Sequence, residues 1–463
     1  MNIETPRPNN SGKPRFNRNK RGAGPNASPS RSQNARSAPE PEQYIRRAIP
    51  DMDSAFTRMG IDARVAINLP KLGIEEPSPI QREAIPAIVA GRDLLGLAQT
   101  GTGKTAAFGL PMLTRLLAGG QRVAPKSCRA LILAPTRELA TQIAQNINDY
   151  AFGTPIRNLR VVGGASINTQ INRMERGVDV LIATPGRLID LIERGAVDLS
   201  QTGYLVLDEA DQMLDIGFIH ALRRIARMLP RNRQTLLFSA TMPKLMEELA
   251  ETYLTDPVRV QVNPPGRPAD KITQGVHFVS QGDKAALLAE YMSKHVGELA
   301  IVFGRTKHGS DKLAKLLDKW GYKVAAIHGN KSQGQRERAL DSFRKGETHV
   351  LVATDVAARG LDIPEVAHIY NYDLPNVPEN YVHRIGRTAR AGRDGRAVAF
   401  CAPGEIDELR AIEKAMKAQI PVVGGEAPPE AKSAPRGRGP AAAPGGARRR
   451  PARRPSRRPK SQQ

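Results

Sequence analysis

Between about residues 44 and 420, short apolar runs alternate with longer stretches in which apolar residues recur at helical spacing. Such runs predict strands buried on both faces of a parallel sheet, joined by helical right-handed crossovers. The first series of predicted strands spans 93–98, 129–135, 157–162, 179–184, 204–209 and 234–240. The second series spans 272–279, 299–305, 323–329, 349–354, 366–372 and 396–402. The pattern predicts an α/β protein with two tandem parallel-sheet domains.

A segment rich in proline separates the two series. Residues 263–270 read NPPGRPAD, and three prolines with a glycine continue neither a helix nor a strand. We therefore expect a short hinge here. The predicted organisation is a basic N-terminal extension, a first domain, the hinge, a second domain and a basic C-terminal tail, at residues 1–43, 44–262, 263–270, 271–420 and 421–463.

The charge of the chain is concentrated at its two ends. The 463 residues carry a net charge of +23, of which +6 lies in residues 1–40 and +11 in residues 431–463, leaving +6 for the middle. Both ends are poor in apolar residues and are predicted to be disordered. A tail that only keeps the protein in solution is one interpretation. The other interpretation is a tether for a polyanion, most simply RNA. The eleven basic residues of the C-terminal tail, with no acidic residue among them, favour this second interpretation.

The sequence also limits the class of protein. The longest apolar runs are far shorter than the roughly 18 residues of a membrane span, and the first twenty residues lack the apolar middle of a secretory signal. The two cysteines, Cys128 and Cys401, are too few for a disulfide framework or a cysteine-built zinc site. We expect a cytoplasmic protein that does not bind membranes.

A phosphate-binding loop is predicted after the first strand. Residues 98–105 read AQTGTGKT and precede a helical pattern. Backbone N–H groups of Gly101, Thr102 and Gly103 would face phosphate oxygens, Lys104 would neutralise them, and the Thr105 hydroxyl would bind Mg²⁺. An ordinary glycine-rich turn is the alternative, and the usual first glycine of the motif is replaced by alanine.

Acidic residues follow a later strand of the same series. Asp208 and Glu209 end the run YLVLDEAD, at the sheet edge where ligands of parallel sheets collect. Asp208 would orient the water shell of Mg²⁺, and Glu209 would act as a general base on the attacking water. The alternative is an acidic helix start that only complements the helix dipole.

The second domain carries a run of arginines. Arg384, Arg387 and Arg390 recur every third residue in HRIGRTAR, so on a helix they would share one face. Phosphoryl transfer commonly uses an arginine from a second domain to stabilise the charge that develops on the γ-phosphate. A solvent-exposed face of ion pairs is the alternative.

Taken together, these motifs make the chain resemble a DEAD-box RNA helicase of superfamily 2, with two RecA-like domains. The resemblance covers about residues 54–405, and the stretch 327–340 further resembles the bacterial RhlE-type subgroup. The matching segments, in order, are PSPIQ (77–81), AQTGTGKT (98–105), PTRELA (135–140), GG (163–164), TPGR (184–187), DEAD (208–211), SAT (239–241), IVFGRT (301–306), ATDVAARGLD (353–362) and HRIGRTAR (383–390).

The resemblance implies roles around ATP. Gln81 corresponds to the family's adenine reader, Phe56 to its isolated upstream aromatic residue, and Asp362 to its ribose contact. Ile74 stands where the family commonly stacks an aromatic ring on adenine, so we expect a weaker grip on the base. Arg387 and Arg390 correspond to the family's two arginine fingers.

Two further sets of roles also come from the resemblance. Ser239 and Thr241, with Asp211 and His383, correspond to residues that couple the nucleotide to the RNA groove. A larger set corresponds to RNA contacts with phosphate and 2′-OH groups, which position a strand without reading its sequence. In the first domain these are Arg137, Gly164, Thr184 and Arg187, and in the second Arg305, Thr306, Gln333, Arg336 and Thr354.

The function expected is an ATP- and Mg²⁺-dependent RNA helicase that unwinds duplexes locally and without processive translocation. Two alternatives stay open: a DNA-directed helicase of the same superfamily, and a non-enzymatic RNA-annealing protein that acts through its tails. A GTPase is disfavoured because no N-K-x-D motif is present. Partners beyond RNA would be ribosome-assembly or RNA-decay complexes, which the sequence does not identify.

Overall fold

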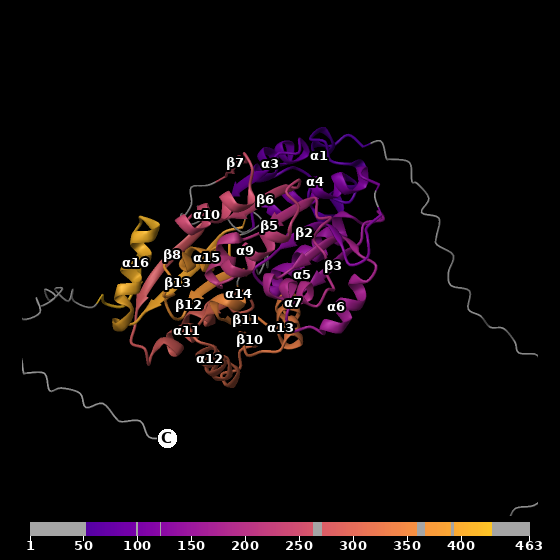
Figure 1. Cartoon of the computed structure of the whole chain (residues 1–463). Coiled ribbons are helices and arrows are strands. Elements are labelled where there is room, and N and C mark those ends of the chain that lie inside the picture. Colours follow the sequence, from indigo (N-terminus) through magenta and orange to yellow (C-terminus); the bar gives the residue numbers. More distant parts are fainter. Residues whose placement is uncertain are drawn as a thin grey trace, which may run out of the picture. The chain divides into compact units, whose positions relative to one another are not determined.

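The structure is a computed structural model that describes residues 52–98, 101–120, 122–262, 271–358, 366–389 and 393–427. Within these ranges the chain forms two parallel sheets of seven strands each (Figure 1). The predicted hinge, most of both predicted tails, Asp362 and Arg390 lie outside the described residues. Across the described ranges, no helix is both long and apolar enough to cross a bilayer.

The first sheet has the strand order β3-β4-β2-β5-β6-β1-β7, and every pairing is parallel. Two of its inner strands, at 178–183 and 204–207, are buried at every position and are mostly apolar, as a sheet covered on both faces requires. The strands are β1 (Leu94–Leu97), β2 (Cys128–Leu133), β3 (Asn158–Val161), β4 (Val178–Ala183), β5 (Tyr204–Leu207), β6 (Gln234–Ser239) and β7 (Val258–Gln261).

Helices cover both faces of this sheet, because alternate strand residues point to opposite sides. Ile132 of β2 joins one hydrophobic cluster, and its neighbours Leu131 and Leu133 join the other. The helices of this part of the chain are α1 (Ala55–Arg58), α2 (Ala63–Ala66), η1 (Pro70–Leu72), α3 (Pro79–Val89), α4 (Lys104–Ala118), α5 (Arg137–Tyr150), α6 (Ile167–Met174), α7 (Pro185–Glu193), α8 (Ala210–Asp215), α9 (Ile219–Met228) and α10 (Lys244–Tyr253).

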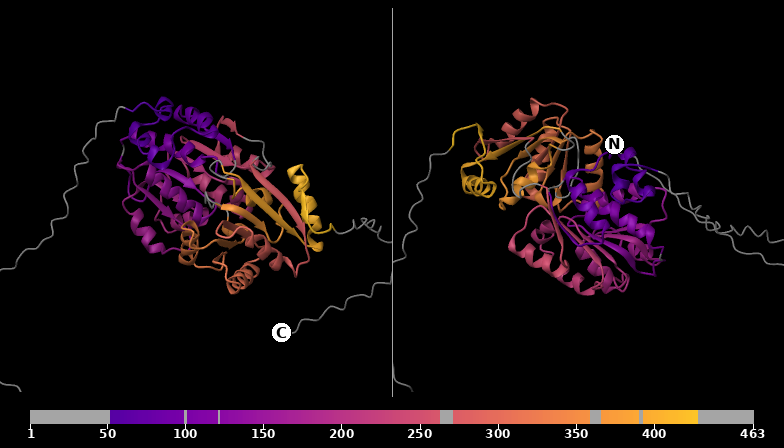
Figure 2. Two further views of the ribbon diagram at one scale, coloured as in Figure 1. Left: turned by 180° about the vertical axis from the view of Figure 1, so that it is seen from behind. Right: turned by 90° about the horizontal axis from the view of Figure 1, so that it is seen from above.

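The second sheet is built in the same way (Figure 2). Its strands are β8 (Ile272–Phe278), β9 (Leu299–Phe303), β10 (Val324–Ile327), β11 (Val350–Ala353), β12 (Val366–Asn371), β13 (Gly395–Cys401) and β14 (Val422–Gly424). Hydrophobic clusters again lie on both faces. The helices are α11 (Lys284–Ser293), α12 (Lys307–Lys319), α13 (Gln333–Arg344), α14 (Asp355–Ala358), α15 (Glu379–Ile385), η2 (Pro403–Glu405) and α16 (Ile406–Met416).

The two sheets have the same topology. The second has the order β10-β11-β9-β12-β13-β8-β14, which is the order of the first sheet with each strand replaced by the one seven places later. The strand β8 therefore occupies the position of β1, and β12 that of β5. Equivalent strand ends in the two units can be compared directly for this reason.

The predicted α/β fold with two parallel sheets is confirmed, and all twelve predicted strands are present. Two strands were missed, β7 and β14, because each is short and lies at a sheet edge, with little continuous burial to mark it. The edge strand β14 pairs with β8 and lies beyond residue 420, where the predicted second domain ends.

Candidate nucleotide and RNA sites

The loop after β1 has the backbone of a phosphate cradle. Gly101 and Gly103 have φ values of +85° and +90°, which favour glycine. A Cβ atom on Gly103 would lie 2.5 Å from Nε2 of Gln81, so the close approach also requires glycine. The helix α4 then begins at Lys104 and directs its first N–H groups toward the loop. The buried Lys104 donates from Nζ to the Ala98 carbonyl, 3.0 Å away.

Gln81 fastens this loop to the helix α3. Its Oε1 accepts from the Ser78 backbone N–H at 2.9 Å, and its Nε2 donates to the Gly103 carbonyl at 3.0 Å. Ser78 adds a second tie, because its hydroxyl donates to the Thr102 carbonyl at 2.8 Å. The sequence analysis assigned Gln81 only to adenine recognition and did not predict that it attaches the phosphate loop to α3. The signal was present in the capping box of Ser78 and Gln81, three residues apart.

The acidic pair lies at the carboxyl end of β5, next to this loop. Asp208 is buried, and burial raises the pKa of its carboxyl group to about 7, although the Lys104 charge opposes the shift. Oδ1 of Asp208 accepts from the Glu209 backbone N–H at 3.0 Å. Glu209 has a φ of +52°, a left-handed conformation that costs a residue with a side chain about 1–2 kcal/mol. Such strain is typical of functional positions.

These residues fit a magnesium ion. A buried carboxylate whose negative charge is disfavoured by burial and by the neighbouring Glu209 is the type of ligand that a divalent cation stabilises. Thr105, at the start of α4, offers a hydroxyl from the cradle itself. Thr105 and Asp208 would therefore hold the ion, which prefers oxygen ligands and keeps several waters.

Asp211 joins the acidic motif to the segment after β6. Its Oδ2 accepts from the backbone N–H groups of Ala240 and Thr241 at 3.1 and 2.9 Å, and from the Thr241 hydroxyl at 3.0 Å. The Ser239 hydroxyl donates to the Thr241 carbonyl at 2.7 Å. A shift of the acidic motif would therefore move the segment 239–241. This is the geometry that a coupling element needs.

The arginine segment of the second unit is not one helix face, and that prediction is wrong. The helix α15 ends at Ile385, and Ala389 has a φ of +56°, so the chain leaves the helix before Arg387. Arg387 is buried and donates from Nε to the His383 carbonyl at 3.1 Å.

Arg384 forms an ion pair inside the second unit. It is buried, and its Nε and Nη2 bind the two carboxylate oxygens of Asp355 at 2.5 and 2.8 Å. Its Nη1 donates to Oδ1 of Asn371 at 3.0 Å, and its guanidinium lies 5.0 Å from the ring centroid of Phe303. Arg384 thus holds α15 and α14 against the sheet.

Several residues predicted to contact RNA line a single groove. Arg137, Thr184, Arg187 and Arg336 border a hollow of about 420 Å³. The Arg137 guanidinium lies over Gly164, where a Cβ atom would approach within 2.1 Å of Nη1. Arg187 donates from Nη1 to the Ala165 carbonyl at 3.1 Å, and Thr184 is the N-cap residue of α7.

Two of the predicted contacts from α13 reach the same groove. Nη1 of Arg137 lies 3.4 Å from Oε1 of Gln333, and Arg336 forms an ion pair with Glu138 at 2.9 Å. Thr354 follows β11, and its carbonyl accepts from the N–H groups of Ala357 and Ala358 in α14. Arginines from both sheets therefore meet in one place, as a phosphate-binding surface requires.

Arg305 and Thr306 are engaged within their own unit. Arg305 donates from Nη2 to Oε1 of Glu405 at 2.8 Å and to the Leu374 carbonyl at 3.2 Å. The Thr306 hydroxyl accepts from the Gly309 N–H at 3.0 Å and caps α12. Their side chains stabilise the end of β9 in this structure.

Comparison with known proteins identifies the family. A family model described as DEAD/DEAH box helicase matches residues 78–249, and one described as helicase conserved C-terminal domain matches residues 283–392. The chain is 43% identical over 365 residues to the ATP-dependent RNA helicase CshA of Listeria monocytogenes, covering 79% of this chain and 69% of that protein. The chain belongs to the DEAD-box helicase family.

Further members of the family resemble it in sequence and in structure. The DEAD-box ATP-dependent RNA helicase CshA of Geobacillus kaustophilus is 42% identical over 79% of this chain and 78% of its own length. The structure of S. cerevisiae Dbp5 bound to RNA and ADP BeF3 has a TM-score of 0.73 and 32% identity, covering 80% of this chain and 96% of Dbp5. Mss116p bound to ssRNA and AMP-PNP has a TM-score of 0.73 and 29% identity, covering 81% and 79%.

One residue that the DEAD-box resemblance associates with the nucleotide lies in the hydrophobic core. Phe56 is 2% exposed and belongs to the hydrophobic cluster under α3 and α4, so its ring offers no face to a bound base. Ile74, where the family commonly has an aromatic residue, is partly buried against the same cluster. Phe56 therefore stabilises the fold of this DEAD-box chain.

Proposed function

We propose that this chain hydrolyses ATP in an RNA-stimulated reaction and uses the cycle to separate short RNA duplexes locally. Family membership makes it an ATP-dependent RNA helicase, that is, an RNA-dependent ATPase. The observation that carries the coupling is the Asp211 carboxylate, which binds the segment 239–241 through three hydrogen bonds. Asp211 lies two residues after Glu209 in the same acidic motif.

The nucleotide roles are proposed residue by residue. The cradle of Gly101, Thr102 and Gly103 would bind the phosphates, and Lys104 would neutralise the charge that grows on them. Magnesium, when bound by Thr105 and Asp208, supplies charge neutralisation of the phosphate oxygens. Glu209, held beside that site in its strained backbone conformation, would accept the proton of the attacking water.

Further contacts with ATP come from both units. Gln81 would read the adenine edge, Asp362 would bind the ribose, and Arg387 and Arg390 would stabilise the charge on the γ-phosphate. His383, whose carbonyl accepts from Arg387, would link this segment to the nucleotide. Hydrolysis would therefore depend on both units acting on the same nucleotide.

The RNA contacts are proposed on the groove lined by Arg137, Thr184, Arg187 and Arg336. Gly164 and Gln333 contact Arg137, and Thr354 is proposed from the family motif alone. Arg305 and Thr306 would have to exchange contacts inside their own unit. Support comes from Dbp5 and Mss116p, whose similar structures are described as bound to RNA and to single-stranded RNA. Backbone contacts of this kind favour no particular sequence.

The remaining predictions concern the cellular setting. We propose that the basic tails tether RNA and that the protein acts in the cytoplasm. The RhlE-type subgroup rests only on residues 327–340 and the basic tail, while the relatives reported above are CshA proteins. Ribosome-assembly or RNA-decay complexes are the partners that such an enzyme would serve.

The test is steady-state ATP hydrolysis with no nucleic acid, single-stranded RNA, duplex RNA and matched DNA. RNA should stimulate the rate strongly, and Glu209→Gln should abolish the stimulated rate, whereas Glu251→Gln at an exposed position should not change it. Removing residues 431–463 should weaken apparent RNA affinity and make its salt dependence shallower, by about 0.7 in log–log slope for each phosphate that the tail no longer neutralises. An unstimulated rate, or equal stimulation by DNA, would refute the proposal.

A further inference from the structure

Two histidines and a glutamate form a cluster at the amino ends of strands β9 and β12 in the second sheet. The nucleotide and RNA residues lie at the opposite, carboxyl ends of the strands. His295 and Glu298 lie in the loop before β9, and His368 lies near the start of β12. The residues discussed above follow the carboxyl ends of the strands, as Arg305 follows β9 and Thr354 follows β11. The proposed helicase chemistry therefore leaves this cluster without a role.

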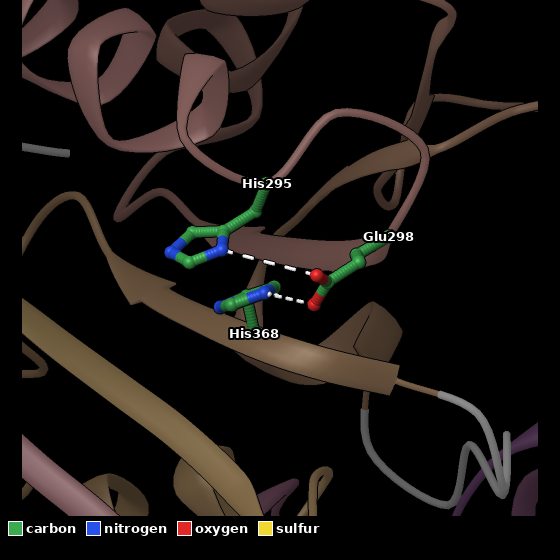
Figure 3. A group of neighbouring side chains, drawn as sticks. All are labelled: His295, Glu298 and His368. Atoms are coloured by element: carbon green, nitrogen blue, oxygen red, sulfur yellow. Dashed lines mark hydrogen bonds and ion pairs between the residues drawn. The ribbon is translucent and has the colours of Figure 1, made fainter.

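The side chains converge on one point. Nε2 of His368 lies 2.7 Å from Oε2 of Glu298, and Nδ1 of His295 lies 3.9 Å from Oε1 (Figure 3). The two imidazole rings are stacked, with centroids 4.2 Å apart. One donor atom from each residue lies within 4.8 Å of the other two. Figure 3 shows both rings turning a nitrogen atom toward the carboxylate.

The backbone holds the three residues in this arrangement. The Glu298 N–H donates to the His295 carbonyl at 3.2 Å, which closes a four-residue turn, and Gly297 adopts a φ of +90° within it. His368 pairs with Ala300 in the neighbouring strand, just beyond Glu298. Two candidate ligands therefore come from one tight turn and the third from the adjacent strand.

We propose that His295, Glu298 and His368 bind a divalent transition-metal ion of the Zn²⁺ class. Two imidazoles and one carboxylate are the donors that such ions accept, with a fourth position left to water. Bonds of about 2.0–2.1 Å in a tetrahedral site place the ligand atoms roughly 3.3 Å apart. The distances of 2.7 and 3.9 Å from Glu298 to the two histidines lie on either side of that value, so the site requires only small movements of these side chains.

The exposure of the three side chains agrees with this site. The side chains of His368, His295 and Glu298 are 6%, 22% and 51% exposed, which leaves a path for the ion from a pocket of about 250 Å³. Arg396 is a nearby positive charge that opposes a cation, and the Glu298 carboxylate offsets it.

The simplest competing explanation is that Glu298 only satisfies the buried His368 through a hydrogen bond. His295→Gln separates the two explanations, because it removes one ligand and leaves the bond between Glu298 and His368 in place. Glu298→Gln removes the carboxylate ligand but keeps an oxygen acceptor opposite His368. His308→Gln, at an exposed position of α12 in the same sheet unit, is the matched control.

The experiment titrates Zn²⁺ into untagged, chelator-treated full-length protein by calorimetry and repeats the titration with Co²⁺, whose visible absorption reports its coordination. We expect one ion per chain, with the dissociation constant raised by at least about tenfold in His295→Gln and in Glu298→Gln. The His308→Gln variant should bind as the wild type does, and Zn²⁺ should raise Tm only where it binds.

The variants that lack a ligand decide the outcome. Equal affinity and stoichiometry in the wild type, His295→Gln and Glu298→Gln would place the ion elsewhere and overturn the proposal. Absence of binding to the wild-type protein would leave the cluster as a hydrogen-bonded pair with a stacked ring, and would also overturn it. ATPase activity is no part of the readout, so the result is independent of the proposed helicase cycle.

Discussion

Replacing Gln81 tests whether this residue holds the phosphate loop or only reads the base. In the structure its buried amide makes two hydrogen bonds, one to the Ser78 N–H and one to the Gly103 carbonyl. Gln81→Ala removes both bonds and leaves two half-buried polar groups without these partners. At about 1–2 kcal/mol for each missing partner, the first unit should lose about 2–4 kcal/mol of stability.

Gln81→Glu sharpens the test, because it separates the two bonds. Its carboxylate still accepts from the Ser78 N–H, but an oxygen atom then faces the Gly103 carbonyl, which is 3.0 Å from Nε2 in the native structure. Two acceptors at that distance repel each other, so this variant should disturb the loop at least as much as Gln81→Ala. Glu83→Ala, at an exposed position of the same helix, is the control and should change neither stability nor binding.

The assay is nucleotide binding, measured in parallel for ATP and GTP. A loosened phosphate loop weakens both nucleotides, because they carry the same triphosphate. If Gln81 only reads adenine, its replacement lowers the affinity for ATP toward that for GTP and leaves the affinity for GTP unchanged. Unchanged GTP affinity, together with unchanged urea unfolding of both variants, would refute the reasoning that Gln81 supports the loop.

Three further predictions rest on single residues and their surroundings. Asp355→Asn leaves the buried Arg384 guanidinium without its ionic partner, so urea unfolding should show a loss of about 3–5 kcal/mol in the second unit. Ala389→Gly relieves a left-handed conformation, worth about 1–2 kcal/mol, against about 0.4–1 kcal/mol of added unfolded-chain entropy, so Tm should rise slightly or stay level and a clear fall would contradict the assignment. Burial raises the pKa of both Cys128 and Cys401 to about 12, so at pH 8 their thiolate fraction is about a thousandfold below that of an ordinary thiol, and a thiol reagent should label them only after unfolding.

The fold was predictable because its strands are long buried runs in a regular alternation with helices. A strand such as β9, which reads LAIVF, is apolar and buried on both sides of the sheet, which is typical of a central parallel strand. The edge strand β14 consists of three residues, two of them exposed valines, and its pairing depends on β8, which is about 150 positions earlier in the chain. The local sequence of β14 therefore does not predict its pairing with β8.

Some features of the candidate site could likewise be predicted from the sequence, and others could not. Motif spacing placed Gly103, Lys104 and Asp208 together, because strand ends of a parallel sheet meet at one edge. The prediction of one helix face for the arginine segment was wrong, because a three-residue repeat is compatible with a helix and also with the turns that follow Ile385. The helix α15 ends at Ile385 with Gly386 as its C-cap residue, and the position of Arg384 is fixed by Asp355 and by Asn371 on a neighbouring strand. That information is tertiary.

The shared topology of the two sheets shows why one unit was predicted to bind phosphate and the other was not. Lys104 begins the helix after β1, and Lys284 begins the helix after the equivalent strand β8. Lys284 is fully buried, and its Nζ lies 2.5 Å from Oε2 of Glu405 and 2.7 Å from the Tyr372 carbonyl.

The difference between the two lysines lies in their anionic partners. Glu405 reaches Lys284 from η2, after β13, so the protein itself supplies the negative charge that a phosphate would bring. The sequence shows the same contrast, since residues 280–284 read SQGDK and lack the paired glycines of residues 101–103. Without a glycine cradle, the N–H groups cannot wrap an external anion, and an internal carboxylate stabilises the buried lysine instead. We infer that the same framework binds nucleotide in the first unit and is closed by an ion pair in the second.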